Sequence, residues 1–191
     1  ESPHFFQDTI PALGVMLHSI PEQERGDVNL VLFNDDSGKA KNKPYGWASY
    51  LLQDLMHVDS SRLVWFQTGE RVCSPGGVMY FFSPIYVFGG APSVGFNLLH
   101  RLTLGQDPRP SERNALVFLS RSDASNGRVS ENEPQAVQAL QQWITSSGLA
   151  LTFHEYTASK ATKEVTVDLF RRTRIAVGVH GGAFLNMFWM S

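Results

Sequence analysis

The feature that most constrains the fold is a regular alternation of short apolar runs and helical patterns near the end of the chain. Apolar runs occupy residues 114–121, 149–156 and 175–180 (NALVFLSR, LALTFHEY and IAVGVH), and helical patterns lie between them at residues 133–147 and 162–174. Consecutive parallel strands need a crossover connection, which a helix supplies, so this alternation predicts parallel pairing. The sequence therefore predicts an α/β fold with a doubly wound, mostly parallel sheet.

The first of these two helices carries start and stop signals. Asn132 is a candidate N-cap, Pro134 falls in the first turn, and Gly148 stands where a left-handed C-terminal residue is expected. Its apolar positions follow helical spacing, which predicts that one face is buried, with Val137, Leu140 and Ile144 on it.

The first hundred residues show the same alternation of helical and apolar patterns less regularly. They read as a helix over residues 8–20, a strand over 29–35, a helix after Pro44 and a strand over 62–67. The polar, proline-bearing segment 105–114 predicts a boundary between a domain over 1–104 and a second over 105–191. Both ends of the chain stop within a pattern, which favours a fragment of a longer protein.

Composition excludes several classes of function. A formal net charge of −2 gives no electrostatic reason to expect nucleic acid, and no run of 18 apolar residues that could span a membrane occurs. The single cysteine, Cys73, cannot form an intramolecular disulfide. HExxH, CxxC and DxD metal patterns are absent, as is the G-x-S-x-G of a hydrolase nucleophile elbow.

The segment VGVHGGAFLNMF is the first candidate site. The strand is expected to end at His180 and a helix to begin near Gly182, at the carboxyl edge where parallel sheets bind ligands. Gly181 and Gly182 allow a ligand to approach the backbone closely, and the free N–H groups of a helix start favour a phosphate. A tight strand-to-helix turn with a hydrogen-bonded histidine explains the same residues equally well.

Two arginines form the second candidate. Arg121 ends the strand over 114–121, and Arg128 follows seven residues later in a polar loop. Two guanidinium groups near a helix start can clamp a diphosphate, because each is permanently charged and binds oxygens in pairs. The alternative is two solvated loop arginines.

The N-terminal segment PHFFQD holds the third candidate. His4 and Asp8 are four residues apart and share a face if the first helix extends back to His4. A carboxylate–imidazole pair can act as a general base, although such a pair is more often a local hydrogen bond.

Taken together and in order, these stretches resemble glycosyltransferase family 61. Its HGAGL-T/S-N motif is matched by residues 180–186, HGGAFLN, with the inner Ala-Gly pair exchanged and Leu185 in place of the small hydroxyl residue. Its S-R … R-x-x-x-N-E signature is matched by Ser120-Arg121 and by Arg128 with Asn132-Glu133.

The resemblance extends over nearly the whole chain. The family's H-F-x-x-D-x-x-P pattern is matched by His4, Phe5, Asp8 and Pro11, and Glu155 matches an acidic residue at the end of a strand. One position departs from the pattern, because Thr166 stands where the family usually has Gln.

The resemblance implies a GT-B fold of two Rossmann-like halves with mostly parallel sheets, incomplete here at both ends. Residues 1–104 would be the C-terminal part of the acceptor-side domain, and residues 105–191 the truncated nucleotide-sugar domain. Families of this fold commonly stabilise the leaving diphosphate with basic residues and helix dipoles. No tightly bound cofactor and no metal requirement are therefore expected.

The implied activity is inverting transfer of a sugar from a UDP-sugar to a hydroxyl of a protein or polysaccharide, and the partners are this donor and a glycan or glycoprotein acceptor. Asp8 or His4 would act as the base. The donor-binding residues would be Arg121, Arg128, Asn132, Glu155, His180, Gly181, Gly182 and Ala183. In a eukaryote the resemblance implies the lumen of the Golgi or endoplasmic reticulum.

A non-catalytic nucleotide-sugar- or glycan-binding domain of the same fold is the alternative. Two departures from the family pattern favour it, namely the exchanged HGGA and Thr166 in place of Gln.

Overall fold

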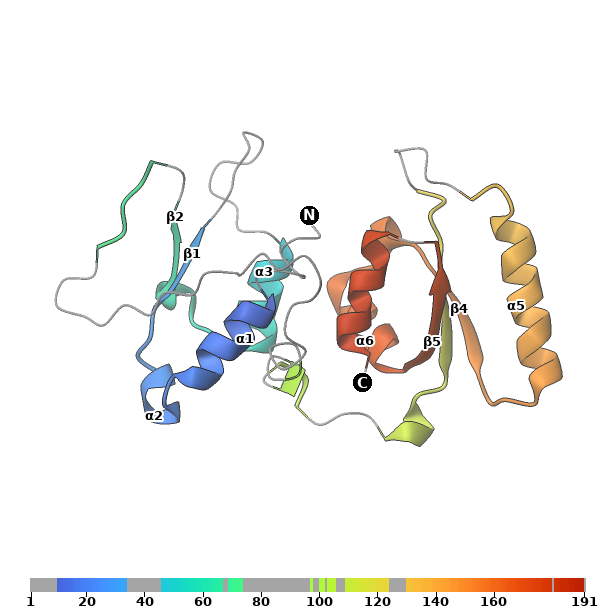
Figure 1. Ribbon diagram of the computed structural model, residues 1–191, viewed down its shortest axis with the longest axis horizontal. Coiled ribbons are helices and arrows are strands. Elements are labelled where there is room, and N and C mark those ends of the chain that lie inside the picture. Colours follow the sequence, from blue (N-terminus) through green and yellow to red (C-terminus); the bar gives the residue numbers. More distant parts are fainter. Residues whose placement is uncertain are drawn as a thin grey trace. The chain divides into compact units, whose positions relative to one another are not determined.

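The computed structural model describes residues 10–33, 46–66, 69–73, 97, 100–101, 103–105, 109–123, 130–179 and 181–190 (Figure 1). The chain divides into two compact units, Glu1–Gly105 and Gln106–Ser191. Among the described residues, each unit shows one small sheet whose strands run parallel. The predicted α/β class with parallel strands is confirmed.

The N-terminal unit is built around a two-stranded sheet. Strands β1 (Leu30–Phe33) and β2 (Leu63–Phe66) pair in register, Leu30 opposite Leu63. Its other elements are α1 (Ile10–Ser19), α2 (Glu22–Arg25), α3 (Gly46–Ser49), the π-helix η2 (Tyr50–Leu55) that continues α3, and the 3₁₀ turn η3 (Ser60–Arg62). The expected strands and helices appear close to their predicted places.

An arginine holds this unit's sheet together at its start. The Arg62 guanidinium donates through Nε and Nη2 to the carbonyl oxygen of Val28, at 3.1 and 2.7 Å, and through Nη2 to that of Arg25. Arg62 directly precedes β2, and Val28 lies just before β1. The three hydrogen bonds therefore hold the starts of β1 and β2 next to each other, in the register that places Leu30 opposite Leu63.

The C-terminal unit is a three-stranded parallel sheet in the order β4-β3-β5. The strands are β3 (Ala115–Leu119), β4 (Thr152–Tyr156) and β5 (Thr173–Gly178), connected by α5 (Glu133–Ser147) and α6 (Lys163–Arg171). The described residues of this unit also form the 3₁₀ helices η4 (Pro110–Glu112), η5 (Ala158–Lys160) and η6 (Gly182–Trp189). The strand and helix pattern predicted for residues 114–180 is confirmed, with element ends shifted by a few residues.

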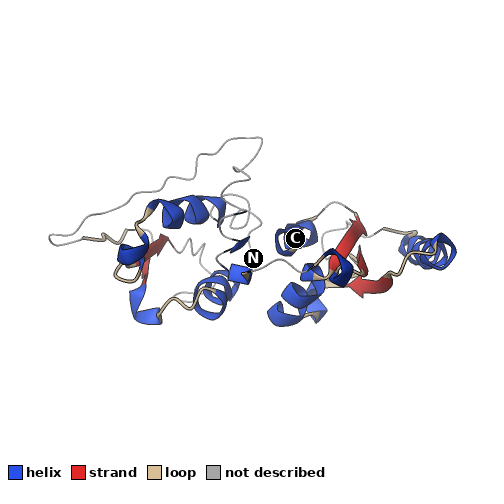
Figure 2. Ribbon diagram, turned by 90° about the horizontal axis from the view of Figure 1, so that it is seen from below, coloured by secondary structure: helices blue, strands red, loops and turns tan. Residues whose placement is uncertain are grey.

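The chain path puts the two helices of this unit on opposite faces of the sheet. From the central strand β3 the chain crosses outward to β4, then back past β3 to β5. Right-handed crossovers in opposite directions place their helices on opposite faces. Figure 1 shows α5 and α6 on either side of β4 and β5, and Figure 2 shows the strands between helices from below.

The core of the C-terminal unit forms where β3, α6 and η6 meet. All five residues of β3 are buried, and so are Phe170 of α6 and Trp189 of η6. The ring of Tyr156 packs edge-on against Phe170 with 5.1 Å between centroids. Burying a side chain of this size contributes about 1.5–3 kcal/mol, so these rings anchor α6 on the sheet.

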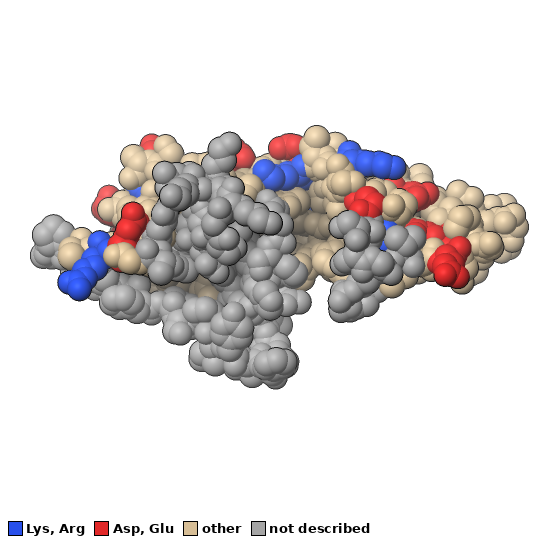
Figure 3. Space-filling model, turned by 90° about the horizontal axis from the view of Figure 1, so that it is seen from above, with Lys and Arg blue, Asp and Glu red and all other residues tan. Residues whose placement is uncertain are grey.

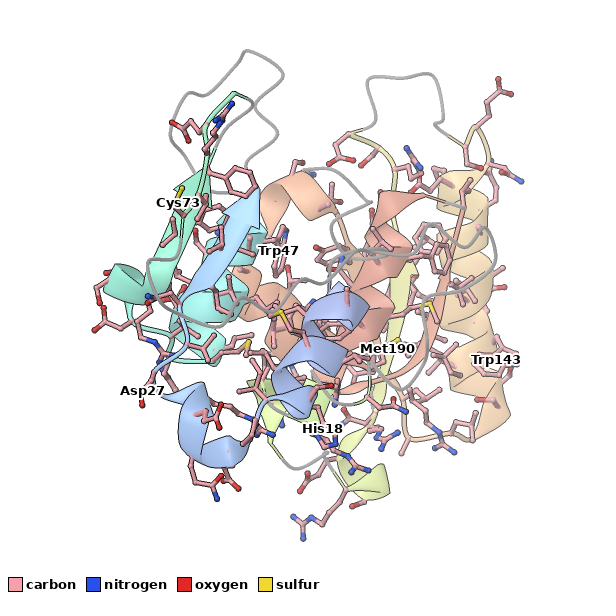
Figure 4. All side chains as sticks on the ribbon, turned by 60° about the vertical axis from the view of Figure 1, so that its left-hand side comes forward. His18, Asp27, Trp47, Cys73, Trp143 and Met190 are labelled. Carbon is pink, nitrogen blue, oxygen red and sulfur yellow. The ribbon has the colours of Figure 1, made fainter. Side chains whose placement is uncertain are left out.

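Helix α5 differs from its predicted detail. Gly148 adopts the expected left-handed conformation, with φ of 67°. Asn132 occupies the N-cap position but its side chain makes no capping hydrogen bond. The predicted apolar face is half-buried, since α5 covers the edge strand β4 and not the centre of the sheet; this holds for Val137, Leu140 and Ile144. Trp143 is 43% exposed and lies on the outer side of α5 (Figure 4).

No helix within the described ranges is both long and apolar enough to cross a bilayer. The exposed Cys73 is a free thiol (Figure 4).

Replacing Gly178 by Ala should destabilise the C-terminal unit. Gly178 pairs with Leu119, and an added Cβ would lie 2.7 Å from Leu119 Cβ and 2.9 Å from its carbonyl oxygen. Overpacking of this kind typically costs about 1–3 kcal/mol. Urea denaturation of the two variants should separate Gly178→Ala from the control Gly26→Ala, whose added Cβ meets nothing within 4 Å. Equal stabilities would contradict the close packing of β3 against β5.

Candidate functional site

The carboxyl ends of β3, β4 and β5 define the candidate site. In a parallel sheet whose connections diverge from a central strand, the loops after the two strands at the divergence leave a crevice in which ligands bind. Here the divergence lies between β3 and β5, because the chain leaves β3 toward β4 and returns on the other side. The loops that begin at Ser120 and at Val179 therefore border this position.

The structure brings two predicted site residues together at this position. The Arg121 guanidinium lies directly against Gly181, so that a Cβ built on Gly181 would collide with Nη1 and lie 2.9 Å from Cζ. Gly181 has φ of 174° and ψ of 177°, an extended conformation open to any residue. An alanine at position 181 would therefore displace the Arg121 side chain, and the space beside Gly181 is filled by a permanent positive charge.

The backbone of Arg121 is held by a side chain that the sequence did not single out for this role. Glu133 Oε1 accepts a hydrogen bond from the Arg121 backbone N–H at 3.0 Å, and Glu133 is only 9% exposed. This bond joins the start of α5 to the end of β3 across twelve residues. Glu133, the last residue of the N-E pair, thereby fixes the position of the Arg121 backbone at the end of β3.

The loops after β3 and β4 are tied by Asp123. Its Oδ2 accepts a hydrogen bond from the Ser159 backbone N–H at 3.2 Å. A hydrogen bond with the Ser159 side chain is the main cause that lowers the pKa of the Asp123 carboxyl, and the backbone bond from Ser159 and the Arg121 charge lower that pKa further. At neutral pH the candidate site thus carries a carboxylate beside its guanidinium.

The chain beyond Gly181 is a 3₁₀ helix. Its first turn closes with the Phe184 N–H donating to the Gly181 carbonyl at 3.0 Å. A Cβ built on Gly182 meets nothing within 4 Å. Of the two adjacent glycines, only Gly181 lies where an added Cβ would displace a neighbouring side chain, and position 182 has room for the alanine of the family motif.

The 3₁₀ helix η6 has one buried face. In a helix of three residues per turn, every third side chain is eclipsed, which places Ala183, Asn186 and Trp189 in one row. Asn186 and Trp189 are buried and Ala183 is half-buried. The Asn186 amide donates through Nδ2 to the Tyr156 hydroxyl at 3.3 Å, linking η6 to the end of β4.

The remaining predicted residues fall into two groups. Asn132 is exposed and its Oδ1 accepts from Ser130 Oγ at 2.7 Å, while Glu155 is exposed on β4, on the face opposite Tyr156. Neither contacts the Arg121–Gly181 pair through a hydrogen bond that the structure describes. Outside the described residues lie His4, Asp8, Arg128 and His180.

Charged side chains of both signs lie on the surface of the described residues. On the face shown in Figure 3, the described Lys and Arg residues are interspersed with Asp and Glu. Within the described ranges, no group of three or more His, Cys, Asp or Glu side chains is arranged to hold a metal ion.

Comparison with known families gives one match. The model of a family described as Glycosyltransferase 61 matches residues 3–191. Neither the curated proteins nor the solved structures include one that matches this chain.

Replacing Glu133 by Ala should destabilise the protein, because the partly buried N–H of Arg121 then loses its acceptor. Leaving such a group without a partner costs about 1–3 kcal/mol. Glu133→Gln keeps an acceptor oxygen and is the matched control, expected to lose less stability. Chemical denaturation of both variants measures the difference, and equal losses would mean that the Glu133–Arg121 bond contributes nothing.

Proposed function

Because the chain belongs to glycosyltransferase family 61, we propose that it transfers a sugar from a UDP-sugar to a hydroxyl of a protein or polysaccharide, with inversion at the anomeric carbon. Membership of the family supports glycosyltransferase activity in general. The donor, the acceptor and the stereochemistry are the proposal.

The observation that carries the proposal is the guanidinium of Arg121 packed against Gly181 at the carboxyl edge between β3 and β5. A diphosphate in this crevice would meet a fixed positive charge and the backbone N–H groups of the first turn of η6. Both features stabilise anions, and the guanidinium group can bind two phosphate oxygens at once. Arg128 and His180 would add to the same site, with His180 donating a hydrogen bond to phosphate or sugar.

The proposed reaction is a single displacement. The acceptor oxygen attacks the anomeric carbon while the bond from that carbon to the diphosphate oxygen breaks on the opposite side. The electron pair of the broken bond leaves with UDP, and the acceptor proton passes to a base. Arg121 would stabilise the charge that develops on the diphosphate, which is the largest electrostatic demand of such a step.

For the base we propose Asp8 or His4, both in the N-terminal unit, which would bind the acceptor in a GT-B arrangement. Under this proposal the C-terminal unit binds the donor, and the protein acts in the Golgi or endoplasmic reticulum lumen of a eukaryotic cell. Full transfer by both Asp8→Asn and His4→Ala would exclude these two residues as the base.

Arg121→Ala should reduce turnover of the donor. A hydrogen bond to a charged group is worth about 1.5–3 kcal/mol, which corresponds to about 10- to 150-fold in affinity for UDP. The full-length protein is incubated with a panel of UDP-sugars and candidate acceptors, and released UDP is measured beside UDP affinity by calorimetry.

Arg174→Ala is the matched control, because Arg174 is exposed and lies at the opposite end of β5 from the site. If the wild-type protein binds UDP but releases no UDP from any donor, the enzyme hypothesis is wrong and the non-catalytic binding domain is the better interpretation. Equal UDP affinity of the wild-type protein and Arg121→Ala would remove Arg121 from the donor site.

The two glycines should respond differently to the same substitution. Gly181→Ala forces the Arg121 guanidinium away, whereas Gly182→Ala enters open space. We expect UDP affinity to fall about tenfold or more in the first variant and to change less than about twofold in the second, given the worth of a charged hydrogen bond. Similar affinities for both variants would show that the packing of Arg121 on Gly181 does not matter for binding.

A further inference from the structure

A chain of hydrogen bonds links α6, the end of β4 and η6. Thr166 Oγ1 donates to the carbonyl oxygen of Thr162 at 2.7 Å, which uses its only proton. The 3.1 Å bond between Tyr156 Oη and Thr166 Oγ1 is therefore donated by the tyrosine. Tyr156 Oη in turn accepts from Asn186 Nδ2 at 3.3 Å. Each hydroxyl in this chain donates one hydrogen bond and accepts another.

The side chains that form this network are buried. Tyr156, Thr166 and Asn186 are all less than 9% exposed. Burial is the main cause that raises the pKa of the Tyr156 phenol, so it remains a neutral donor at physiological pH. A buried donor that loses its acceptor is costly, and a break at one end is therefore felt along the chain.

At the far end of this network, Asn186 ties η6 to Tyr156 of β4 through a side-chain hydrogen bond. Asn186 shares the buried row of η6 with Ala183 and Trp189, one helical turn beyond the glycines. Trp189 fixes the end of η6 in the core, while Asn186 fixes its rotation. Backbone N–H groups point along the axis of a helix, so a rotation or tilt of η6 would move the first-turn N–H groups after Gly181 away from their present positions.

We propose that Tyr156 and Thr166 are positioning residues, which act through Asn186 to hold the turn at Gly181–Ala183 in the orientation that binds the diphosphate of the donor. The part concerning the donor rests on the proposed function, whereas the part concerning the turn does not. Neither residue touches the donor. Thr166 thus has a defined partner in this chain, although it stands where the family pattern has Gln.

Thr166→Val tests the proposal, because it keeps the shape of the side chain and removes the hydroxyl. The expected result is amide hydrogen exchange about three- to tenfold faster in the segment 181–190, and a rise of similar size in the dissociation constant for UDP. Thr166→Ser restores the hydroxyl and should return both quantities toward the wild-type values. Tyr156→Phe, which breaks the chain at its centre, should behave like Thr166→Val.

Thr173→Val is a closely matched control. Thr173 is as deeply buried as Thr166, at 1% exposed, and its Oγ1 also donates to a carbonyl four residues earlier, that of Leu169, at 2.9 Å. It lies at the start of β5, at the opposite end of that strand from the turn. A loss of global stability alone should therefore appear in both variants, while faster exchange in 181–190 should appear only in Thr166→Val.

Equal exchange in the two valine variants would overturn the positioning role, whether or not the protein binds UDP. Faster exchange in Thr166→Val with unchanged UDP affinity would confirm the effect on the turn and overturn its link to the donor. Failure of the wild-type protein to bind UDP would count against the proposed function, and the exchange comparison would still decide the role of the network.

Discussion

The C-terminal unit depends on the burial of one strand. β3 pairs with β4 on one side and β5 on the other, and all five of its residues are buried. A strand that is buried on both faces is apolar throughout, and with parallel neighbours on both sides it requires that the crossovers from β3 to β4 and from β4 to β5 run in opposite directions. Those requirements place α5 and α6 on opposite faces and open the loops between β3 and β5. The location of the candidate site therefore follows from the position of β3 in the sheet before any charged residue is considered.

A single close contact then brings the two strongest motifs of the chain together. Arg121 follows β3, Gly181 follows β5, and the guanidinium occupies the space that a side chain at 181 would need. Glu133 holds the backbone of the same arginine from the start of α5. Arg121 of the S-R pair, Glu133 of the N-E pair and the first glycine of HGGA are thus parts of one cluster. The exchanged Gly182 lies in open space, so this departure from the family pattern leaves the cluster intact.

The sequence predicted the elements better than the contacts among them. Alternating apolar and helical patterns, with Gly148 as the helix stop, were enough for the parallel sheet, because periodicity and special backbone conformations are local properties. The half-burial of Val137, Leu140 and Ile144 depends on α5 lying over an edge strand, which no local pattern reveals. Glu133 was visible as a motif residue, but its bond to the Arg121 backbone spans the loop between two elements. Tyr156 gave no signal, since one buried tyrosine at a strand end is ordinary core.

The buried network bears on the choice between an enzyme and a binding domain that has lost turnover. Loss of function typically leaves polar groups of the old site without partners or replaced by apolar residues, since nothing then maintains a costly buried hydroxyl. At position 166 the chain instead has a buried threonine whose donor and acceptor capacity are both used, by Thr162 and Tyr156. The tyrosine passes this constraint to Asn186, the asparagine of the family motif. Because Thr166 makes both of these hydrogen bonds, its presence in place of Gln is a weaker argument for an inactive protein. The network favours a site whose geometry is still maintained.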